Sequence, residues 1–168
     1  MNKEKIVTAL QWILAIFNKH NISYQIAGGF AAHLYGATRH VNDIDFDIPE
    51  EDFDEIYEDV KEFIIYGPER FKNKKWNLFL MTLEYHGQKI DIGGAESTKI
   101  FDDHTQKWVK SPTHFSNSRI IRFHDIPLLI IDPTDLKEYK KLLIDKDNLH
   151  QEHDVKAIEL FLAAERNS

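Results

Sequence analysis

The chain has 168 residues, of which 42% are hydrophobic, and it carries 11 Phe, 3 Trp and 6 Tyr but no cysteine. This composition supplies enough apolar material for one packed core, and it excludes a disordered chain, a disulfide framework and thiolate chemistry. The formal net charge of −7 argues against nonspecific binding to a nucleic-acid backbone.

The opening residues lead into an amphipathic run without the continuous apolar block of a signal peptide. No segment approaches the roughly 20 apolar residues needed to cross a bilayer. We therefore expect a cytoplasmic protein that does not associate with membranes.

The first half of the chain shows clear periodic patterns. Apolar residues at helical spacing predict a helix over residues 3–20. A short strand over 23–27 is expected to stop at a glycine pair, and a short helix over 30–35 follows. Residues 43–48 (DIDFDI) alternate between acidic and apolar side chains, which is typical of a strand with two different faces.

The remaining elements are expected in this order: an acidic helix over 50–63, a hairpin with arms 77–85 and 88–92 around His86-Gly87, strands over 119–123 and 126–131, and helices over 136–144 and 153–166. The basic stretch 70–75 is interpreted as a solvated loop. Together these elements predict one α+β domain over residues 1–168. Its mixed sheet is flanked by helices, and a helical segment begins at about residue 133.

The stretch 26–48 carries the most informative chemistry. Gly28 and Gly29 end a predicted strand, so the backbone there can approach a ligand closely, and the helix that follows points free amides at the same place. Asp43 and Asp45 lie on one strand face, with Cα atoms about 6.5–7 Å apart. The glycine pair and the acid pair together predict a phosphate cradle beside a divalent-cation site.

A strand with one solvated face would explain the acid pair equally well on its own. A third carboxylate, Asp91, favours the metal interpretation because it alternates with isoleucines on a predicted strand. Glu84, in the other arm of the same hairpin, competes with Asp91 for this role. Mg²⁺ prefers oxygen ligands and commonly takes one or two carboxylates plus substrate phosphates.

The ordered motifs Gly28-Gly29, Thr38-Arg39, Asp43-Ile44-Asp45 and Ile90-Asp91-Ile92 resemble the nucleotidyltransferase superfamily with a polymerase-beta-like catalytic core. Within it, the chain is most similar to the group of aminoglycoside and lincosamide nucleotidyltransferases and AbiEii-type toxins. The resemblance covers residues 20–165 and implies a nucleotidyltransferase-like mixed sheet.

The resemblance also implies site roles and an activity. Nucleoside monophosphate would move from an NTP to an acceptor, with Mg²⁺ or Mn²⁺ as cofactor. The implied metal ligands are Asp43, Asp45 and Asp91, with Asp91 favoured as the catalytic base, and the implied nucleotide-binding residues are Gly28, Gly29, Thr38, Arg39 and Lys140.

The C-terminal third matches the family pattern less closely. Lys140 corresponds to the family's lysine after a strand, Pro and Asp-Leu, and Lys146-Asp147 and Asp154 resemble its later motif. The arginine that the family often carries has no counterpart, since Ile144 and Asp145 stand there.

The sequence does not identify the acceptor, which could be a small molecule, an RNA or a protein, and it gives no indication of oligomeric state. An alternative is a nucleotidyltransferase-fold binding or regulatory protein with little catalysis, such as a component of a toxin–antitoxin pair. The presence of all three acids favours the enzyme.

Overall fold

The computed structural model describes all 168 residues, Met1–Ser168. The helices are α1 (Lys3–Lys19), α2 (Gly28–Leu34), α3 (Phe53–Val60), α4 (Pro133–Leu143) and α5 (His150–Arg166). The strands are β1 (Gln25–Ala27), β2 (Asp43–Ile48), β3 (Ile64–Lys72), β4 (Trp76–Tyr85), β5 (Gln88–Gly94), β6 (Lys99–Asp102), β7 (Lys107–Lys110), β8 (Arg119–Phe123) and β9 (Ile126–Ile130). Single 3-10 turns lie at Glu50–Asp52, Lys61–Phe63 and Phe115–Asn117.

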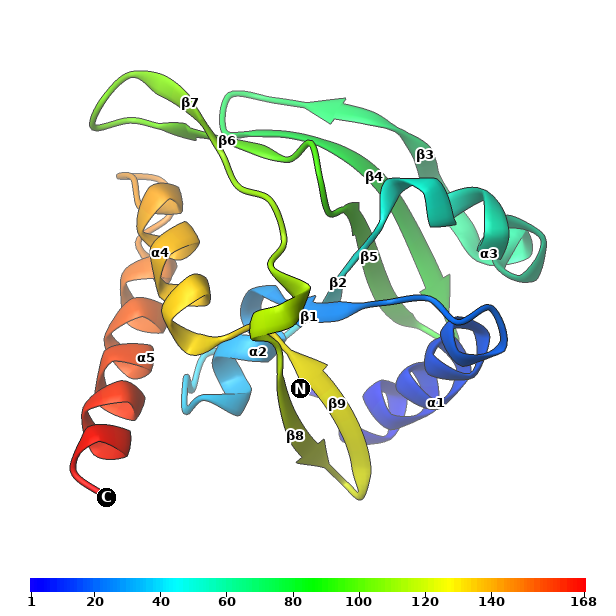
Figure 1. Cartoon of the computed structure of the whole chain (residues 1–168), viewed down its shortest axis with the longest axis horizontal. Coiled ribbons are helices and arrows are strands. Elements are labelled where there is room, and N and C mark those ends of the chain that lie inside the picture. The colour runs from blue at the N-terminus through cyan, green and yellow to red at the C-terminus, as the bar shows by residue number, and fades with distance from the viewer.

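All strands belong to one mixed sheet (Figure 1). Its order is β7-β6-β4-β5-β2-β1-β9-β8, and β3 pairs with β4 off this path. β2 runs parallel to β5 and β1 runs parallel to β9, whereas the other pairings are antiparallel. The predicted α+β class with a mixed sheet and flanking helices is thus confirmed. None of the helices is both long and apolar enough to span a bilayer.

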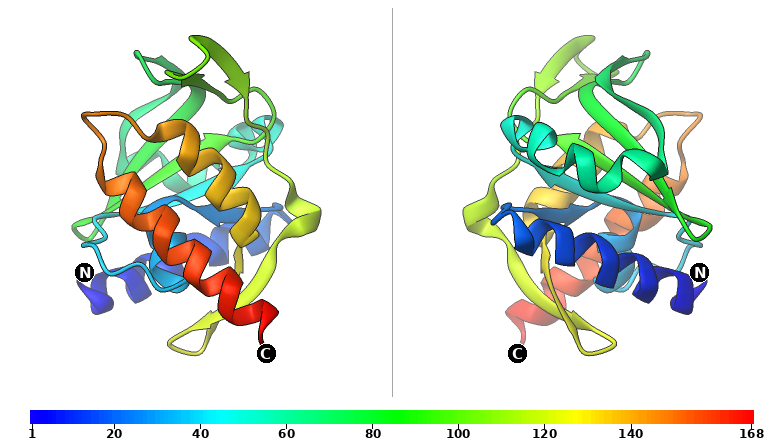
Figure 2. Two further views of the ribbon diagram at one scale, coloured as in Figure 1. Left: turned by 90° about the vertical axis from the view of Figure 1, so that its left-hand side faces the viewer. Right: turned by 90° about the vertical axis from the view of Figure 1, so that its right-hand side faces the viewer.

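The two faces of the sheet have different roles, as the alternation in β2 predicts. Ile44, Phe46 and Ile48 are at most 1% exposed and join the main hydrophobic core with apolar residues of α1 and α3. The acidic residues of β2 lie on the opposite face because successive side chains of a strand alternate. Figure 2 shows α1 and α3 on one side of the sheet and the α4–α5 pair on the other.

Helix α4 begins at a capped N-terminus, at residue 133, where the sequence predicted the helical segment to start. The Asp132 side chain accepts a hydrogen bond from the Thr134 amide, and Pro133 occupies the first helical position, where its missing N–H costs nothing. The last helix begins at His150, three residues before the predicted start at residue 153 (153 − 150). α4 and α5 pack against each other and together cover one side of the sheet (Figure 2).

Three strands were not predicted from the sequence, and the interpretation of residues 70–75 as a solvated loop was only partly correct: residues 73–75 form neither helix nor strand, but residues 70–72 belong to a strand. Arg70 and Lys72 belong to β3, whose central Gly67-Pro68 interrupts the alternation on which strand prediction depends. β6 and β7 are four residues each, too short for a clear period.

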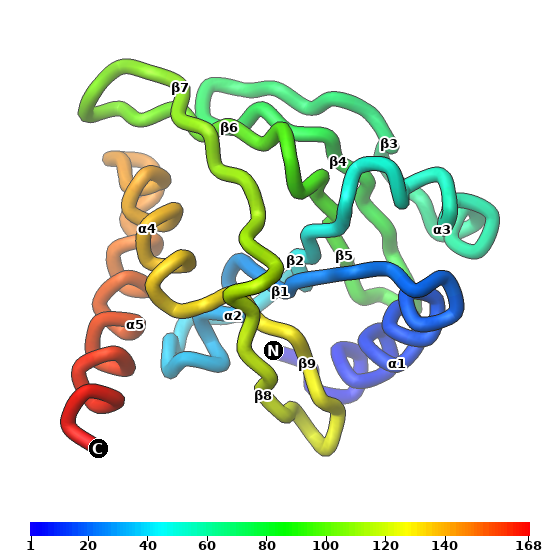
Figure 3. The backbone as a smooth tube through the Cα atoms, viewed as in Figure 1, coloured from blue at the N-terminus to red at the C-terminus, as the bar shows by residue number.

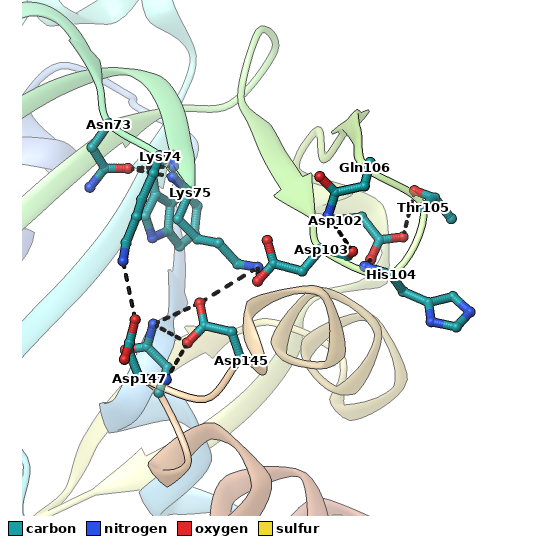
Figure 4. Close-up of polar contacts among 12 residues, drawn as sticks. Asn73, Lys74, Lys75, Asp102, Asp103, His104, Thr105, Gln106, Asp145 and Asp147 are labelled. Atoms are coloured by element: carbon teal, nitrogen blue, oxygen red, sulfur yellow. Dashed lines mark hydrogen bonds and ion pairs between the residues drawn. The ribbon is translucent and has the colours of Figure 1, made fainter.

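Lys75, at the end of that basic stretch, is only 5% exposed. Its ammonium lies 3.4 Å from Asp103 and 4.0 Å from Asp145, while the neighbouring Lys74 bonds Asp147 at 3.2 Å (Figure 4). This ionic cluster connects the start of β4 with the β6–β7 turn and the α4–α5 loop.

Candidate active site

The site is built on two neighbouring parallel strands. The register of β2 and β5 places Asp45 directly opposite Asp91, on strands that pack about 4.8 Å apart. The Thr82 hydroxyl of β4 donates to Asp91 Oδ1 at 2.6 Å. Glu84, the alternative third acid, is exposed and pairs in register with Lys89. Asp91, not Glu84, therefore faces Asp45.

The carboxylates of β2 carry more negative charge than their surroundings balance. Burial, followed by the charges of Asp91 and Asp43, raises the pKa of Asp45 to about 7. Burial also raises the pKa of Asp43, and the positive charge of the Lys89 ammonium partly opposes this increase. A cation at this position would relieve the repulsion and favour the ionised carboxylates.

The donor set of Asp43, Asp45 and Asp91 fits a hard divalent cation because all its ligating atoms are carboxylate oxygens. The structure contains no group of three acidic, histidine or cysteine side chains already gathered around one point. The arrangement therefore suits a cation that takes one or two carboxylates and completes its shell with water and substrate phosphates.

A cavity of about 670 Å³ opens between this face of the sheet and α4. Six of the predicted site residues line it: Gly28, Gly29, Arg39, Asp45, Asp91 and Lys140. Asp43 and Thr38 do not line the cavity, and Thr38 is exposed. Figure 3 shows the connection between β7 and β8 crossing in front of β1, and residues 111–114 of this connection form part of the cavity wall.

The glycine turn packs directly against the acid strand. Gly28 has φ +66°, and a Cβ at this position would lie 1.9 Å from Asp45 Oδ2, so no other residue fits without displacing the carboxylate. The Gly28 amide is already bonded, because it donates to the Tyr139 hydroxyl at 2.6 Å. A Cβ on Gly29 would lie 2.7 Å from the Arg39 guanidinium. In this conformation, the Arg39 guanidinium lies against the predicted phosphate cradle.

Sequence reasoning missed the role of Tyr139 in this cavity. Burial, and then the charges of Asp45 and Asp47, raise its pKa well above the usual value, so the phenol stays protonated. The only sequence signal for Tyr139 was its position next to Lys140, which was already a candidate site residue. No residue pattern predicts that the Tyr139 hydroxyl accepts a hydrogen bond from the Gly28 amide, 111 positions earlier.

Asp47 is a further carboxylate that lines the cavity, and no arginine or lysine pairs with it. Burial raises its pKa to about 7, and a hydrogen bond with Thr113 only partly opposes this shift. Because the folded state holds the proton more tightly than the unfolded state, Asp47 makes folding less favourable as pH rises from about 4 to above 7.

We therefore expect Asp47→Asn to stabilise the ligand-free protein at pH 8 and to have little effect near pH 4. One pKa unit corresponds to about 1.4 kcal/mol, and Asp47 keeps some contact with solvent, so a gain of about 2 kcal/mol at pH 8 is expected. Urea unfolding at both pH values measures it, with the exposed Glu159→Gln as control. Equal stability of wild type and Asp47→Asn at pH 8 would contradict the expected cost of the charge.

This combination of a mixed sheet, paired acids on parallel strands and an adjoining glycine turn defines a nucleotidyltransferase-fold protein. Solved structures agree with this class. A protein from Thermotoga maritima assigned as a nucleotidyltransferase superposes with a TM-score of 0.65 at 17% identity, covering 98% of this chain and 96% of that one. The family model described as aminoglycoside-2''-adenylyltransferase matches residues 9–151, and the chain belongs to this family.

Two further solved structures share the fold. The antibiotic-resistance factor ANT(2'')-Ia gives a TM-score of 0.60 at 15% identity, covering 99% of this chain and 94% of that one. The lincosamide antibiotic adenylyltransferase LnuA gives a TM-score of 0.52 at 16% identity, covering 89% of this chain and 94% of that one. A search of curated proteins found no match. The predicted resemblance to the aminoglycoside and lincosamide group is therefore confirmed.

Proposed function

We propose that the chain is a metal-dependent nucleotidyltransferase that moves a nucleoside monophosphate from an NTP to a hydroxyl group of an acceptor. The observation that carries the proposal is the juxtaposition of Asp45 and Asp91 beside the Gly28–Gly29 turn in one cavity. Membership of an adenylyltransferase family supports nucleotidyl transfer as the reaction class.

In this proposal, Asp43 and Asp45, with or without Asp91, hold the divalent cation, either Mg²⁺ or Mn²⁺. The bound cation would supply charge neutralisation at the phosphate oxygens. The acceptor oxygen attacks the α-phosphorus, the bond from that phosphorus to the bridging oxygen breaks, and pyrophosphate leaves.

Asp91 would take the proton of the acceptor hydroxyl. Because Thr82 donates to Oδ1, the orientation of the Asp91 carboxylate is fixed and Oδ2 has no protein donor. A general base must be held within hydrogen-bond reach of the proton that it removes. Asp91 lines the same cavity as Asp45, so an acceptor bound there can reach both.

The nucleotide's phosphates would lie at the end of the cavity formed by Gly28, Gly29 and Arg39. Lys140 lines this end too, but its ammonium already donates to Asp154 and to Gln151, each at 2.8 Å. Its contribution to the phosphates would be mainly its charge. Thr38 enters the proposal only through the family resemblance, since it lies outside the cavity.

The test is a transfer assay with NTPs labelled at the α-phosphate. The family and two structural neighbours are named for adenylyl transfer to aminoglycosides and lincosamides, so ATP and these antibiotics are the first reactants to try. A cell extract then tests RNA and protein acceptors. Label transfer by wild type and its loss in Asp45→Asn is the expected result. NTP binding without transfer to any acceptor would instead favour the binding or regulatory protein.

A further inference from the structure

A fully buried carboxylate joins the C-terminal helices to the phosphate end of the cavity. Asp154, in the first half of α5, is 0% exposed. Arg39 reaches it from the connection between α2 and β2, 115 residues earlier, with Nε 2.9 Å from both carboxylate oxygens and Nη2 2.9 Å from Oδ2. Lys140 of α4 adds its ammonium at 2.8 Å from Oδ2.

The two cations differ in how much of their hydrogen-bonding capacity remains free. The Lys140 side chain is 2% exposed, and its ammonium bonds both Asp154 and Gln151. The Arg39 side chain is 30% exposed and lines the cavity. A guanidinium has five N–H donors, of which the one on Nε donates to Asp154, while Nη2 lies 2.9 Å from Asp154 Oδ2. Arg39 therefore keeps donors for a ligand.

The position of the guanidinium depends on Asp154. Residues 37–42, which carry Arg39, form neither helix nor strand, so their backbone does not fix the long side chain. The guanidinium nonetheless lies against Gly29, close enough that a Cβ there would come within 2.7 Å of Nη2. The Asp154 carboxylate supplies the constraint, because Nε donates to both of its oxygens and Nη2 lies 2.9 Å from Oδ2, so it holds the guanidinium along the edge formed by Nε and Nη2.

Asp154 can hold this position because it stays charged. Burial opposes its ionisation, but the hydrogen bonds from Arg39 and the charge of Lys140 outweigh burial and lower its pKa. Two cations facing one carboxylate leave a net positive charge at this end of the cavity, and the acids of β2 and β5 lie nearby. The positive end therefore favours an anionic ligand such as a phosphate chain.

We propose that Asp154 is a positioning residue for nucleotide binding: it holds the Arg39 guanidinium over the glycine turn so that its free N–H groups meet the β- and γ-phosphates of the NTP. The inference rests on the proposed function, since it assumes that an NTP occupies this cavity. It assigns direct phosphate contact to Arg39, and it gives Asp154 of α5 an influence on triphosphate affinity although Asp154 does not itself line the cavity.

The test compares ATP and AMP binding by calorimetry in the presence of Mg²⁺. Asp154→Asn removes the charge, and its amide group would point a donor at one edge of the guanidinium. We expect ATP affinity to fall about tenfold or more and AMP affinity to change little, since AMP lacks the phosphates concerned. Arg39→Ala should behave alike, and Asp154→Asn added to Arg39→Ala should cause no further loss. The control is Glu152→Gln, which removes an exposed carboxylate from the same helix.

Asp154→Asn leaves the buried Lys140 ammonium without its carboxylate and could therefore fold poorly. A second variant allows the same test without changing Asp154. Gly29→Ala should displace the guanidinium while leaving Asp154 intact, and the same selective loss of ATP affinity is expected. Equal loss of ATP and AMP affinity, or an undiminished effect of Asp154→Asn in the Arg39→Ala background, would overturn the positioning role. If the wild type binds no NTP, the proposed function fails as well; if it binds ATP and Asp154→Asn binds it equally, only this inference fails.

Discussion

Asp91→Asn is expected to lower the rate of nucleotidyl transfer by about 10²-fold or more while metal-dependent NTP binding persists. Asparagine has nearly the same shape as aspartate and can still accept the Thr82 hydrogen bond, but it cannot take a proton from the acceptor. Single-turnover transfer and calorimetric NTP binding, measured on the same preparation, separate these two effects.

Asp91 could instead serve mainly as a metal ligand, and the two roles compete. A neighbouring dication favours the ionised carboxylate, which makes it a weaker base. If Asp91→Asn abolishes metal-dependent NTP binding completely, the ligand role is correct. The matched control is Glu84→Gln, an exposed acid on the adjoining strand whose loss should leave turnover unchanged. Unchanged turnover in Asp91→Asn as well would favour the binding-protein alternative.

The second large effect is expected from the Asp43→Asn, Asp45→Asn double variant. Mg²⁺ or Mn²⁺ with an NTP should raise the melting temperature of the wild type, since a ligand that binds only the folded state stabilises it. At a hundred times its Kd the stabilisation is about 2.7 kcal/mol, or roughly 5–10 °C for a chain of this size. The double variant should show almost none of this shift.

The physical reason is the charge on β2. Without a cation, burial and the neighbouring acids raise the pKa of Asp45 to about 7, so a divalent ion has a large favourable interaction to gain at neutral pH. Neutral asparagines remove this interaction and also the repulsion, so the ligand-free double variant should fold, as circular dichroism would verify. A shift equal to that of the wild type would show that the nucleotide binds without these two residues.

Much of the fold could be predicted because its signals are local. The alternation in DIDFDI determines which side chains of β2 enter the core, and the His86-Gly87 turn determines the β4–β5 hairpin. β3, β6 and β7 were missed because their pairing is set by neighbouring strands and not by a period of their own. The same holds for Lys75, whose burial depends on Asp103 and Asp145 from distant loops.

The site was predictable where residues close in sequence act together, as Gly28 and Gly29 do. The contacts between residues that are far apart in the sequence could not be predicted. Tyr139 reaches the Gly28 amide across 111 positions, and Asp154 reaches Arg39 across 115. The family pattern pointed to Lys140 and Asp154 without indicating that they bond each other. Direct phosphate contact by Lys140 stays a prediction, now with its ammonium held by two other partners.

The sheet order has a consequence for how the molecule folds. β1 lies between β2 and β9, and Ile26 pairs with Ile130 across 104 positions (130 − 26). Such non-local pairings form late, because the chain must first lose the conformational entropy of closing a long loop before the stabilising contacts can form. The cavity draws on residues from Gln25 to Gln151, so it exists only once almost the whole chain is in place. A chain still emerging from the ribosome would carry both acid strands and yet be unable to hold a nucleotide until α5 had docked.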